Sequence, residues 1–307
     1  MCIRDRSNKT KLTDEPQIAV VYVLGAIVPG KSTNTLMGNN IVGSETIINA
    51  IRSAEKNERV KAIVLRVDSP GGSALASDLI WNEIRKCKKP VIASMGDVAA
   101  SGGYYVAMGA KQIFADEGTL TGSIGVVGGK VALEDTFHKL GITTDIVSRG
   151  KNSGVFSLLQ PFSESERQAL GAMMKNIYEQ FVSKAALSRG MNQKQMDPLA
   201  EGKVYTGRQA KTLGLVDQLG GLHEAILAAK KSAGLKAEDQ IDLLPLPRRK
   251  TFFEELFDTE SIDSKSPQIS LKNISLPWTQ LLAEAEILSL VFRYPVQTIL
   301  PCLISIH

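Results

Sequence analysis

Short β-branched runs alternate with helix-like segments along most of this chain. The runs end at glycine, serine or aspartate, which is typical of buried strands. The segments between them carry apolar residues at the three- and four-residue spacing of a helix that covers one face of a sheet. This order predicts an α/β fold with a largely parallel sheet and flanking helices. The expected strands are 17–28, 60–69, 89–96, 111–118 and 143–150, and the expected helices are 43–57, 73–87 and 133–141.

A mainly helical part follows the alternating part. Ser163 and Glu166 have the spacing of a capping box, so a long helix is expected from there to Gly190. Two shorter helical patterns lie between residues 205 and 234, and the pattern weakens after Pro247. These changes predict a disordered or non-native tail at 1–14, a main domain at 15–247 and an appendage at 248–307.

The composition argues against several kinds of function. The 36 basic and 32 acidic residues give a net charge of +4, which is too balanced to indicate a nucleic-acid partner. Cys2, Cys87 and Cys302 are far apart and odd in number, so no disulfide framework, metal site or cofactor is expected. No unbroken apolar run reaches the roughly 20 residues of a membrane span. The first residues lack the apolar stretch of a secretion signal, and we expect that an N-terminal part is missing.

The stretch DVAASGGYYVAMGA, residues 97–110, places Ser101 between two alanines and two glycines. No bulky neighbour shields the hydroxyl, and Gly102 allows a substrate to approach the main-chain N–H groups closely. This environment suits a nucleophile. It also suits a plain helix N-cap, because a serine in front of a helix can bind the first free N–H groups.

A second glycine pair lies in DSPGGSALASDLI, residues 68–80. Gly71 and Gly72 follow a buried strand and leave main-chain N–H groups unshielded, as an oxyanion hole or anion site requires. The alternative is an ordinary turn from strand to helix with Ser73 as its cap. Because parallel strands end at the same sheet edge, this turn and the one containing Ser101 are expected to meet.

Two other stretches allow more than one interpretation. In TLTGSIGVVGGK, residues 119–130, Ser123 could bring a second hydroxyl to the pocket or simply mark a glycine-rich turn. The stretch GAIVPGKS, residues 25–32, matches the pattern of a phosphate-binding loop. Such a loop must be followed by a helix whose N–H groups face the phosphates, and TNTLMGNNIVG has no helical stripe. A nucleotide site is therefore the less favoured interpretation.

Together, SPGG, MGDVAASGGYY and LTGSIGVVGG resemble the signal peptide peptidase A family, the S49 serine peptidases of the Clp protease and crotonase superfamily. The resemblance runs from about Gln17 to Gly221, where GKVYTGRQAKTLGLVDQLGG is similar to the closing helical segment of that family. It is greatest to the C-terminal half of the long, two-domain bacterial form. It implies a Clp protease/crotonase-like fold and cleavage of leftover signal peptides in or near the membrane.

The resemblance also implies roles for individual residues. Ser101 would be the nucleophile, and Gly72 and Gly102 would offer oxyanion-hole N–H groups. Ser123 would orient the lysine of a Ser–Lys dyad, whose pKa must be lowered by burial for the amine to accept the serine proton. His138, His223 and His307 are the only histidines, and we interpret each as a surface or capping residue.

The source of the lysine is where this chain departs from the single-domain members. Their lysine follows the strand that matches TTDIVSRG, and the alignment places Ser153 at that position, with Lys151 two residues early. A shift of two residues moves a group roughly 6 to 7 Å along a strand. Lys151 is thus a doubtful base, and Lys130 a weaker candidate. In the two-domain form the lysine comes from the N-terminal half, which the resemblance implies is missing here.

The leading hypothesis is the serine-bearing half of a membrane-associated peptidase that degrades signal-peptide remnants and other apolar peptides. It would form a homo-oligomer or pair with a lysine-bearing N-terminal half. It would lie at the bacterial inner membrane on the periplasmic or extracytoplasmic side, attached through a segment absent from this sequence. One alternative is a catalytically silent assembly domain of the same fold. A more distant one is an ordinary Ser–His hydrolase, although AASGG has alanine where the usual nucleophile elbow has its first glycine.

Overall fold

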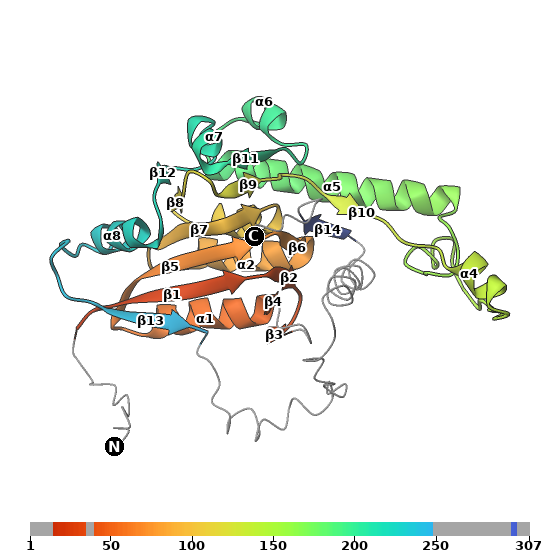
Figure 1. The fold of residues 1–307 in the computed structure, drawn as a ribbon, viewed down its shortest axis with the longest axis horizontal. Coiled ribbons are helices and arrows are strands. Elements are labelled where there is room, and N and C mark those ends of the chain that lie inside the picture. Colours follow the sequence, from red (N-terminus) through yellow and green to blue (C-terminus); the bar gives the residue numbers. More distant parts are fainter. Residues whose placement is uncertain (1–14, 35–39, 248–295, 300–307) are drawn as a thin grey trace, which may run out of the picture.

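An eight-stranded sheet forms the centre of the molecule (Figure 1). The computed structural model describes residues 15–34, 40–247 and 296–299, so the tail at 1–14 and most of the segment after Pro247 lie outside the described residues. The sheet order is β11-β9-β7-β5-β1-β13, with β8 next to β7 and β12 next to β8. Its strands are β1 (Gln17–Leu24), β5 (Val60–Ser69), β7 (Val91–Ala100), β8 (Gln112–Ala115), β9 (Leu120–Gly122), β11 (Val204–Thr206), β12 (Gln218–Leu219) and β13 (Asp242–Leu246).

Every pairing in this sheet except that between β11 and β9 is parallel. The expected α/β fold with a largely parallel sheet is therefore confirmed. Side chains of the long strands alternate between two cores, because successive residues of a strand face opposite sides of the sheet. In β1, Val21 and Val23 lie in the larger core on one face, whereas Ile18 and Val20 lie in the smaller core on the other.

The helices that cover the sheet form where the sequence has an apolar stripe. Helix α1 (Ser44–Lys56) buries Ile47, Ile51 and Ala54 at the spacing of one helix face. Helix α2 (Ala74–Lys86) begins at Ser73, whose Oγ accepts a hydrogen bond from the N–H of Ala76 at 3.3 Å. Helix α8 (Leu222–Ser232) packs against β5 and β7 on the opposite face. Covering both faces is the usual condition for a parallel sheet.

A second sheet of six short strands lies at one end of the first. Its order is β10-β14-β6-β2-β4-β3. The chain passes from β1 into this sheet at Gly25, whose φ of 91° favours glycine. The strands are β2 (Ala26–Val28), β3 (Thr33–Asn34), β4 (Asn40–Gly43), β6 (Gly71–Ser73), β10 (Val127–Gly128) and β14 (Val296–Ile299).

The structure does not support the interpretation of residues 25–32 as a nucleotide-binding loop. Residues 26–28 of that stretch form strand β2, and the described chain reaches its next helix only at Ser44, after β3 and β4. The hydroxyl of Ser32 accepts a hydrogen bond from the N–H of Gly43 at 2.9 Å. The Ser32 side chain therefore stabilises the local backbone.

An arm extends from the body between β10 and helix α5 (Glu164–Ser188). It contains α4 (Glu134–Lys139), which buries none of its residues, and Figure 1 shows it at the end of α5 farthest from the central sheet. The expected strand at 143–150 is wrong, because these residues form no regular element and Val147 is 98% exposed. The segment has β-branched residues but, in the described structure, no neighbouring strand to pair with.

The long helix predicted from Ser163 is confirmed. Ser163 and Glu166 form the expected capping box at the start of α5. The chain then continues through α6 (Gln193–Met196), a 3-10 turn at Asp197–Leu199, and α7 (Gly207–Thr212). None of the helices in the described part of the chain is long and apolar enough to cross a membrane.

An ion pair fastens the end of α5 to the body, and its loss should destabilise the protein. Arg189 donates to Gly214 O at 2.8 Å and makes two hydrogen bonds with the carboxylate of Asp217, which also accepts from the N–H of Ile113 at 2.7 Å. The Arg189 side chain is only 8% exposed. Asp217→Ala would leave this charge buried without its partner, and we expect the free energy of unfolding to fall by about 3 kcal/mol.

Urea unfolding of the full chain measures this change. The matched control is Glu179→Ala, which removes the exposed i,i+4 partner of Lys175. Exposed pairs of that kind contribute about 0.5 kcal/mol or less. Equal small losses in the two variants would contradict the structural importance assigned to the Arg189–Asp217 pair.

Candidate active site

Ser101 lies at the junction between β7 and the short helix α3 (Gly102–Ala107). Its backbone has φ 53° and ψ −115°, a conformation that non-glycine residues rarely adopt. The Ser101 N–H donates to Gly122 O at 2.8 Å, which ties this turn to the end of β9. Strained backbone of this kind persists only where the surrounding structure imposes it, and it is common at functional sites.

The Ser101 hydroxyl has no hydrogen-bond partner among the described residues. Ser101 is 1% exposed, and its Oγ is buried and unpaired. The interpretation of Ser101 as an ordinary N-cap is wrong, because its side chain makes no hydrogen bond to the start of α3. Ser73, by contrast, does cap α2. A buried hydroxyl without a partner is uncommon and requires an explanation other than local capping.

The two glycine-lined turns meet at one edge of the central sheet, as the parallel pattern predicts. Strand β5 ends at Ser69, which pairs with Ala99 near the end of β7. Gly102 begins α3, and Gly103 packs so tightly that an added Cβ would lie 2.6 Å from Ser69 O. The start of α3, with its free N–H groups, is thereby pressed against the end of β5.

Gly72 lies in β6, where a larger residue would not fit. Its φ is 152°, and an added Cβ would lie 2.1 Å from Ile27 O. Gly72 is paired with Ile27 of β2 on one side and with Thr298 of β14 on the other. The sequence suggests an oxyanion role for this glycine, and the structure places it on a strand that leads directly into α2.

Ser123 joins this group through β9. Strand β9 pairs with the end of β7, so Ser123 follows Gly122 at the point where Gly122 O accepts from the Ser101 N–H. Ser123 is 2% exposed and has φ 50°, and its N–H donates to Lys203 O at 2.7 Å. The structure therefore brings Gly72, Gly102, Ser101 and Ser123 to one edge of the sheet.

Helix α3 is held by two tyrosines whose roles the sequence analysis did not identify. The hydroxyl of Tyr104 donates to Leu215 O at 3.0 Å, and that of Tyr105 donates to Asp78 Oδ1 at 2.8 Å. Burial raises the pKa of Tyr104, and burial together with the bond to Asp78 raises that of Tyr105. Both phenols thus stay protonated donors. The sequence shows the two tyrosines directly after SGG, but it does not show their hydrogen-bond partners, which lie far away in the chain.

Asp78 in turn links α3 to α5. Lys184 of α5 makes an ion pair with Asp78, and its amine lies 4.5 Å from the ring centroid of Trp81. The Tyr105 ring packs on Phe181, with centroids 4.4 Å apart. These contacts fix the helix whose first N–H groups lie beside Ser101.

The in-chain candidates for a base do not reach Ser101. Lys151 is exposed and lies in a turn of the arm between α4 and α5. Lys130 is buried, with its side chain 3% exposed, but its amine donates to Gly154 O at 3.0 Å and lies 4.0 Å from Glu166 Oε2. The N–H of Ser163, with Lys130 further off, lowers the pKa of Glu166. Lys130 therefore fastens the arm to the start of α5.

The histidines also lie apart from the candidate nucleophile. His138 and His223 are both exposed, and His307 lies outside the described residues. Because the Ser101 hydroxyl has no partner in the described part of the chain, neither His138 nor His223 is placed as its base. The Ser–His hydrolase interpretation has no support from the described residues.

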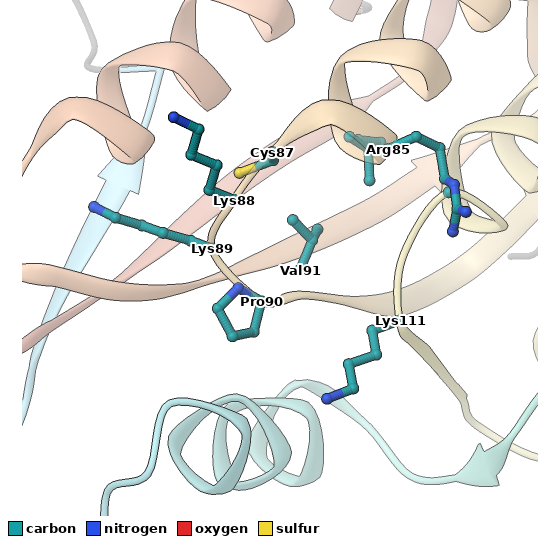
Figure 2. A pocket seen from close by; sticks show the side chains of 9 residues that line it. Arg85, Cys87, Lys88, Lys89, Pro90, Val91 and Lys111 are labelled. Carbon is teal, nitrogen blue, oxygen red and sulfur yellow. The ribbon is translucent and has the colours of Figure 1, made fainter.

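A pocket of about 340 Å³ lies at the other end of β7 (Figure 2). Arg85, Lys88, Lys89 and Lys111 surround it, and burial raises the pKa of the nearby Cys87 thiol. The Lys89 amine donates hydrogen bonds to Ala54 O and Asn57 O at the end of α1. Since β7 is a ten-residue strand, this pocket is about 30 Å from Ser101. It is separate from the candidate active site.

Two family models match the sequence. The model described as peptidase family S49 matches residues 83–236, which include Ser101 and Ser123. The Clp protease model matches residues 36–115, which include Gly72 and Gly102. Both matches therefore fall on the part of the chain that forms the site.

Known proteins are similar over most of the chain. It is 41% identical over 243 residues to "Serine protease SPPA, chloroplastic" of Arabidopsis thaliana, covering 78% of this chain and 36% of that protein. It is 40% identical over 235 residues to Protease 4 of Salmonella typhi, covering 76% and 37%. It is 33% identical over 248 residues to a protein of Synechocystis sp. named as a candidate protease, covering 78% and 85%. The chain thus spans little more than a third of the first two relatives.

Proposed function

The chain belongs to peptidase family S49, and from that premise we propose that it is the nucleophile-bearing part of a serine peptidase. The Clp protease match and the largely parallel sheet establish the expected Clp protease-like α/β fold. The observation that carries the proposal is the buried, unpartnered Oγ of Ser101 at a strained junction between strand and helix.

In the proposed reaction, Ser101 Oγ attacks the carbonyl carbon of a peptide bond and its proton passes to a neutral lysine amine. The oxygen of the tetrahedral intermediate accepts hydrogen bonds from the N–H groups of Gly72 and Gly102. Each such donor typically contributes roughly 3 to 4 kcal/mol of transition-state stabilisation. The lysine then gives its proton to the leaving amine, and water hydrolyses the acyl-serine ester by the same route.

The lysine in this proposal comes from outside the described residues. Lys151 and Lys130 lie elsewhere, and the site is buried enough to lower the pKa of an amine placed in it. An N-terminal half of the two-domain type would supply that amine, and Ser123 would orient it.

The proposed substrates are signal-peptide remnants and other apolar peptides. Leu75 and Leu79 are 63% and 41% exposed on the first turns of α2, directly after β6. They present apolar side chains beside the strand on which an extended substrate would lie. The proposed setting is a homo-oligomer, or a complex with the lysine-bearing half, on the extracytoplasmic side of the bacterial inner membrane.

Complementation tests this proposal. Hydrolysis of an apolar fluorogenic peptide is measured with the chain alone, and then with the chain mixed with the N-terminal half of a two-domain relative. We expect no hydrolysis by the chain alone and clear hydrolysis by the mixture.

The other outcomes have distinct meanings. Hydrolysis by the chain alone would place the base within it, and Lys151→Ala would be the first substitution to examine. If a mixture that is shown to be folded and associated does not hydrolyse the peptide, the alternative of a catalytically silent assembly domain would be favoured. That alternative agrees with the lack of a partner for the Ser101 hydroxyl among the described residues.

A further inference from the structure

Two helices begin close after the two glycines proposed above as oxyanion donors. Helix α2 follows Gly72 and Ser73 of β6, and α3 begins at Gly102. The two helices contact each other, and α3 also contacts β6. The distance between the two donors therefore depends on how α3 lies against α2.

A side-chain hydrogen bond joins these two helices. The Tyr105 hydroxyl of α3 donates to Asp78 Oδ1 of α2 at 2.8 Å. The main-chain N–H of Tyr105 donates to Ser101 O at 2.8 Å, so the same residue closes the first turn of α3 on the candidate nucleophile. A shift of Asp78 would thus reach Ser101 and Gly102 through a single residue.

The Tyr105 hydroxyl adds a constraint that its ring alone does not give. Tyr105 is 2% exposed, and its ring centroid lies 4.4 Å from that of Phe181 and 6.3 Å from that of Trp81. A phenylalanine ring could make the same contacts. Apolar packing is non-directional, whereas a hydrogen bond weakens steeply when its angle departs from linear. The bond to Asp78 therefore restricts the rotation of α3 about its own axis.

A third helix holds the accepting carboxylate. Lys184 of α5 makes an ion pair with Asp78 Oδ1, and its amine lies 4.5 Å from the ring centroid of Trp81. An ionised acceptor makes the hydrogen bond from Tyr105 stronger than a neutral one would. Asp78 is thus the point at which α2, α3 and α5 are joined.

We propose that Asp78 is a positioning residue, which acts through Tyr105 to fix the distance between the N–H groups of Gly72 and Gly102. The inference rests on the proposed function, because this distance matters only if both groups bind one oxyanion. Such donors must lie about 2.7 to 3.1 Å from the oxygen, and a misplacement of about 1 Å can cost about 100-fold in rate. Because the oxyanion is absent from the bound substrate, loss of the bond should lower kcat and leave KM nearly unchanged.

Tyr105→Phe tests the proposal in the full chain mixed with the lysine-bearing half. It removes one hydroxyl, keeps the ring and leaves Asp78 paired with Lys184. We expect kcat to fall about 10- to 100-fold, with KM within about twofold of the parent. The matched control is Tyr205→Phe, which removes a hydroxyl that donates to Leu199 O at 3.2 Å. Both constants of this control should stay within about twofold of the parent.

Asp78→Ala shows whether Asp78 acts through Tyr105. It should lower kcat by at least as much as Tyr105→Phe. The double variant should lose no more than Asp78→Ala alone, because the bond between the two side chains is already absent. Losses that multiply in the double variant would overturn the route through Tyr105, as would an unchanged kcat in either single variant.

A peptide aldehyde gives a readout that a general loosening of the fold would not reproduce. Ser101 Oγ bonds to the aldehyde carbon, the hydroxyl proton passes to the lysine amine, and the former carbonyl oxygen takes the place of the oxyanion. In Tyr105→Phe the Ki of this inhibitor should rise by the factor by which kcat falls, whereas the Kd of the matching peptide alcohol should stay within about twofold. Equal changes in Ki and Kd would overturn the positioning role.

Hydrogen exchange of the chain alone needs no catalysis. The N–H groups of Ser101 and Tyr105 donate to Gly122 O and Ser101 O. A peptide covering 101–108 should exchange about fivefold faster in Tyr105→Phe than in the parent, as expected for the loss of one hydrogen bond, and Tyr205→Phe should match the parent. Unchanged exchange would overturn the proposal. Faster exchange with silent complementation would defeat only the peptidase, whereas active complementation with an unchanged kcat in Tyr105→Phe would defeat only the positioning role.

Discussion

Replacing Ser101 with alanine is expected to lower the kcat/KM of the complemented enzyme by about 10⁴-fold or more, because the substitution removes the atom that forms the acyl intermediate. The fold should be unaffected. Ser101 Oγ makes no hydrogen bond within the described residues, so its removal breaks no described contact and relieves a buried, unpaired oxygen. The melting temperature should be unchanged or slightly higher.

Two controls make this result specific to the site. Lys151→Ala removes an exposed amine of the arm, and Ser153→Ala removes an exposed hydroxyl two residues further on. Both should leave kcat/KM within about twofold of the parent, in line with surface changes away from a site. Retained hydrolysis in Ser101→Ala, with the mixture associated, would remove Ser101 from the role of nucleophile.

Gly72→Ala should produce the second large effect, a loss of stability. An alanine Cβ would lie 2.1 Å from Ile27 O and 2.7 Å from Ile27 N, both backbone atoms that no rotamer change can move. The φ of 152° adds strain for any residue with a side chain. Together these costs predict a fall of about 3 to 5 kcal/mol in the free energy of unfolding.

Gly118→Ala is the matched control for that experiment. An added Cβ at Gly118 meets nothing within 4 Å, so its free energy of unfolding should change by about 0.5 kcal/mol or less. Urea unfolding at a constant m-value gives both numbers. A small effect at Gly72 would mean that β2 and β6 separate easily at this point.

Much of the fold follows from local sequence. Strands such as Val60–Ser69 and Val91–Ala100 are mostly apolar because most of their residues are buried on both faces of the sheet, and helix α1 shows its apolar stripe directly. The segment 143–150 has similar residues and is not a strand. Strand formation depends on a neighbour as well as on β-branched side chains, and the sequence does not specify the neighbour.

The sequence predicts only part of the site, because the remaining features depend on contacts between distant segments. Parallel order alone indicates that the turns around Gly72 and Ser101 meet. The strain at Ser101 and its unpartnered Oγ come from tertiary packing, as do the anchors that Tyr104 and Tyr105 find at Leu215 and Asp78. The pairing of β14 with β6 joins residues more than 200 positions apart, and no local pattern indicates it.

The order of synthesis gives the position of β14 a further consequence. Every strand of the central sheet, together with β6 and β10, precedes residue 248, whereas β14 begins at Val296. Ribosomes add about 5 to 20 residues per second, so about 50 further residues take roughly 3 to 10 seconds to appear. During that interval β6 and β10 are both present, and the strand that pairs with each of them has not yet been made. Strands β6 and β10 therefore keep these edges unpaired until β14 has been made.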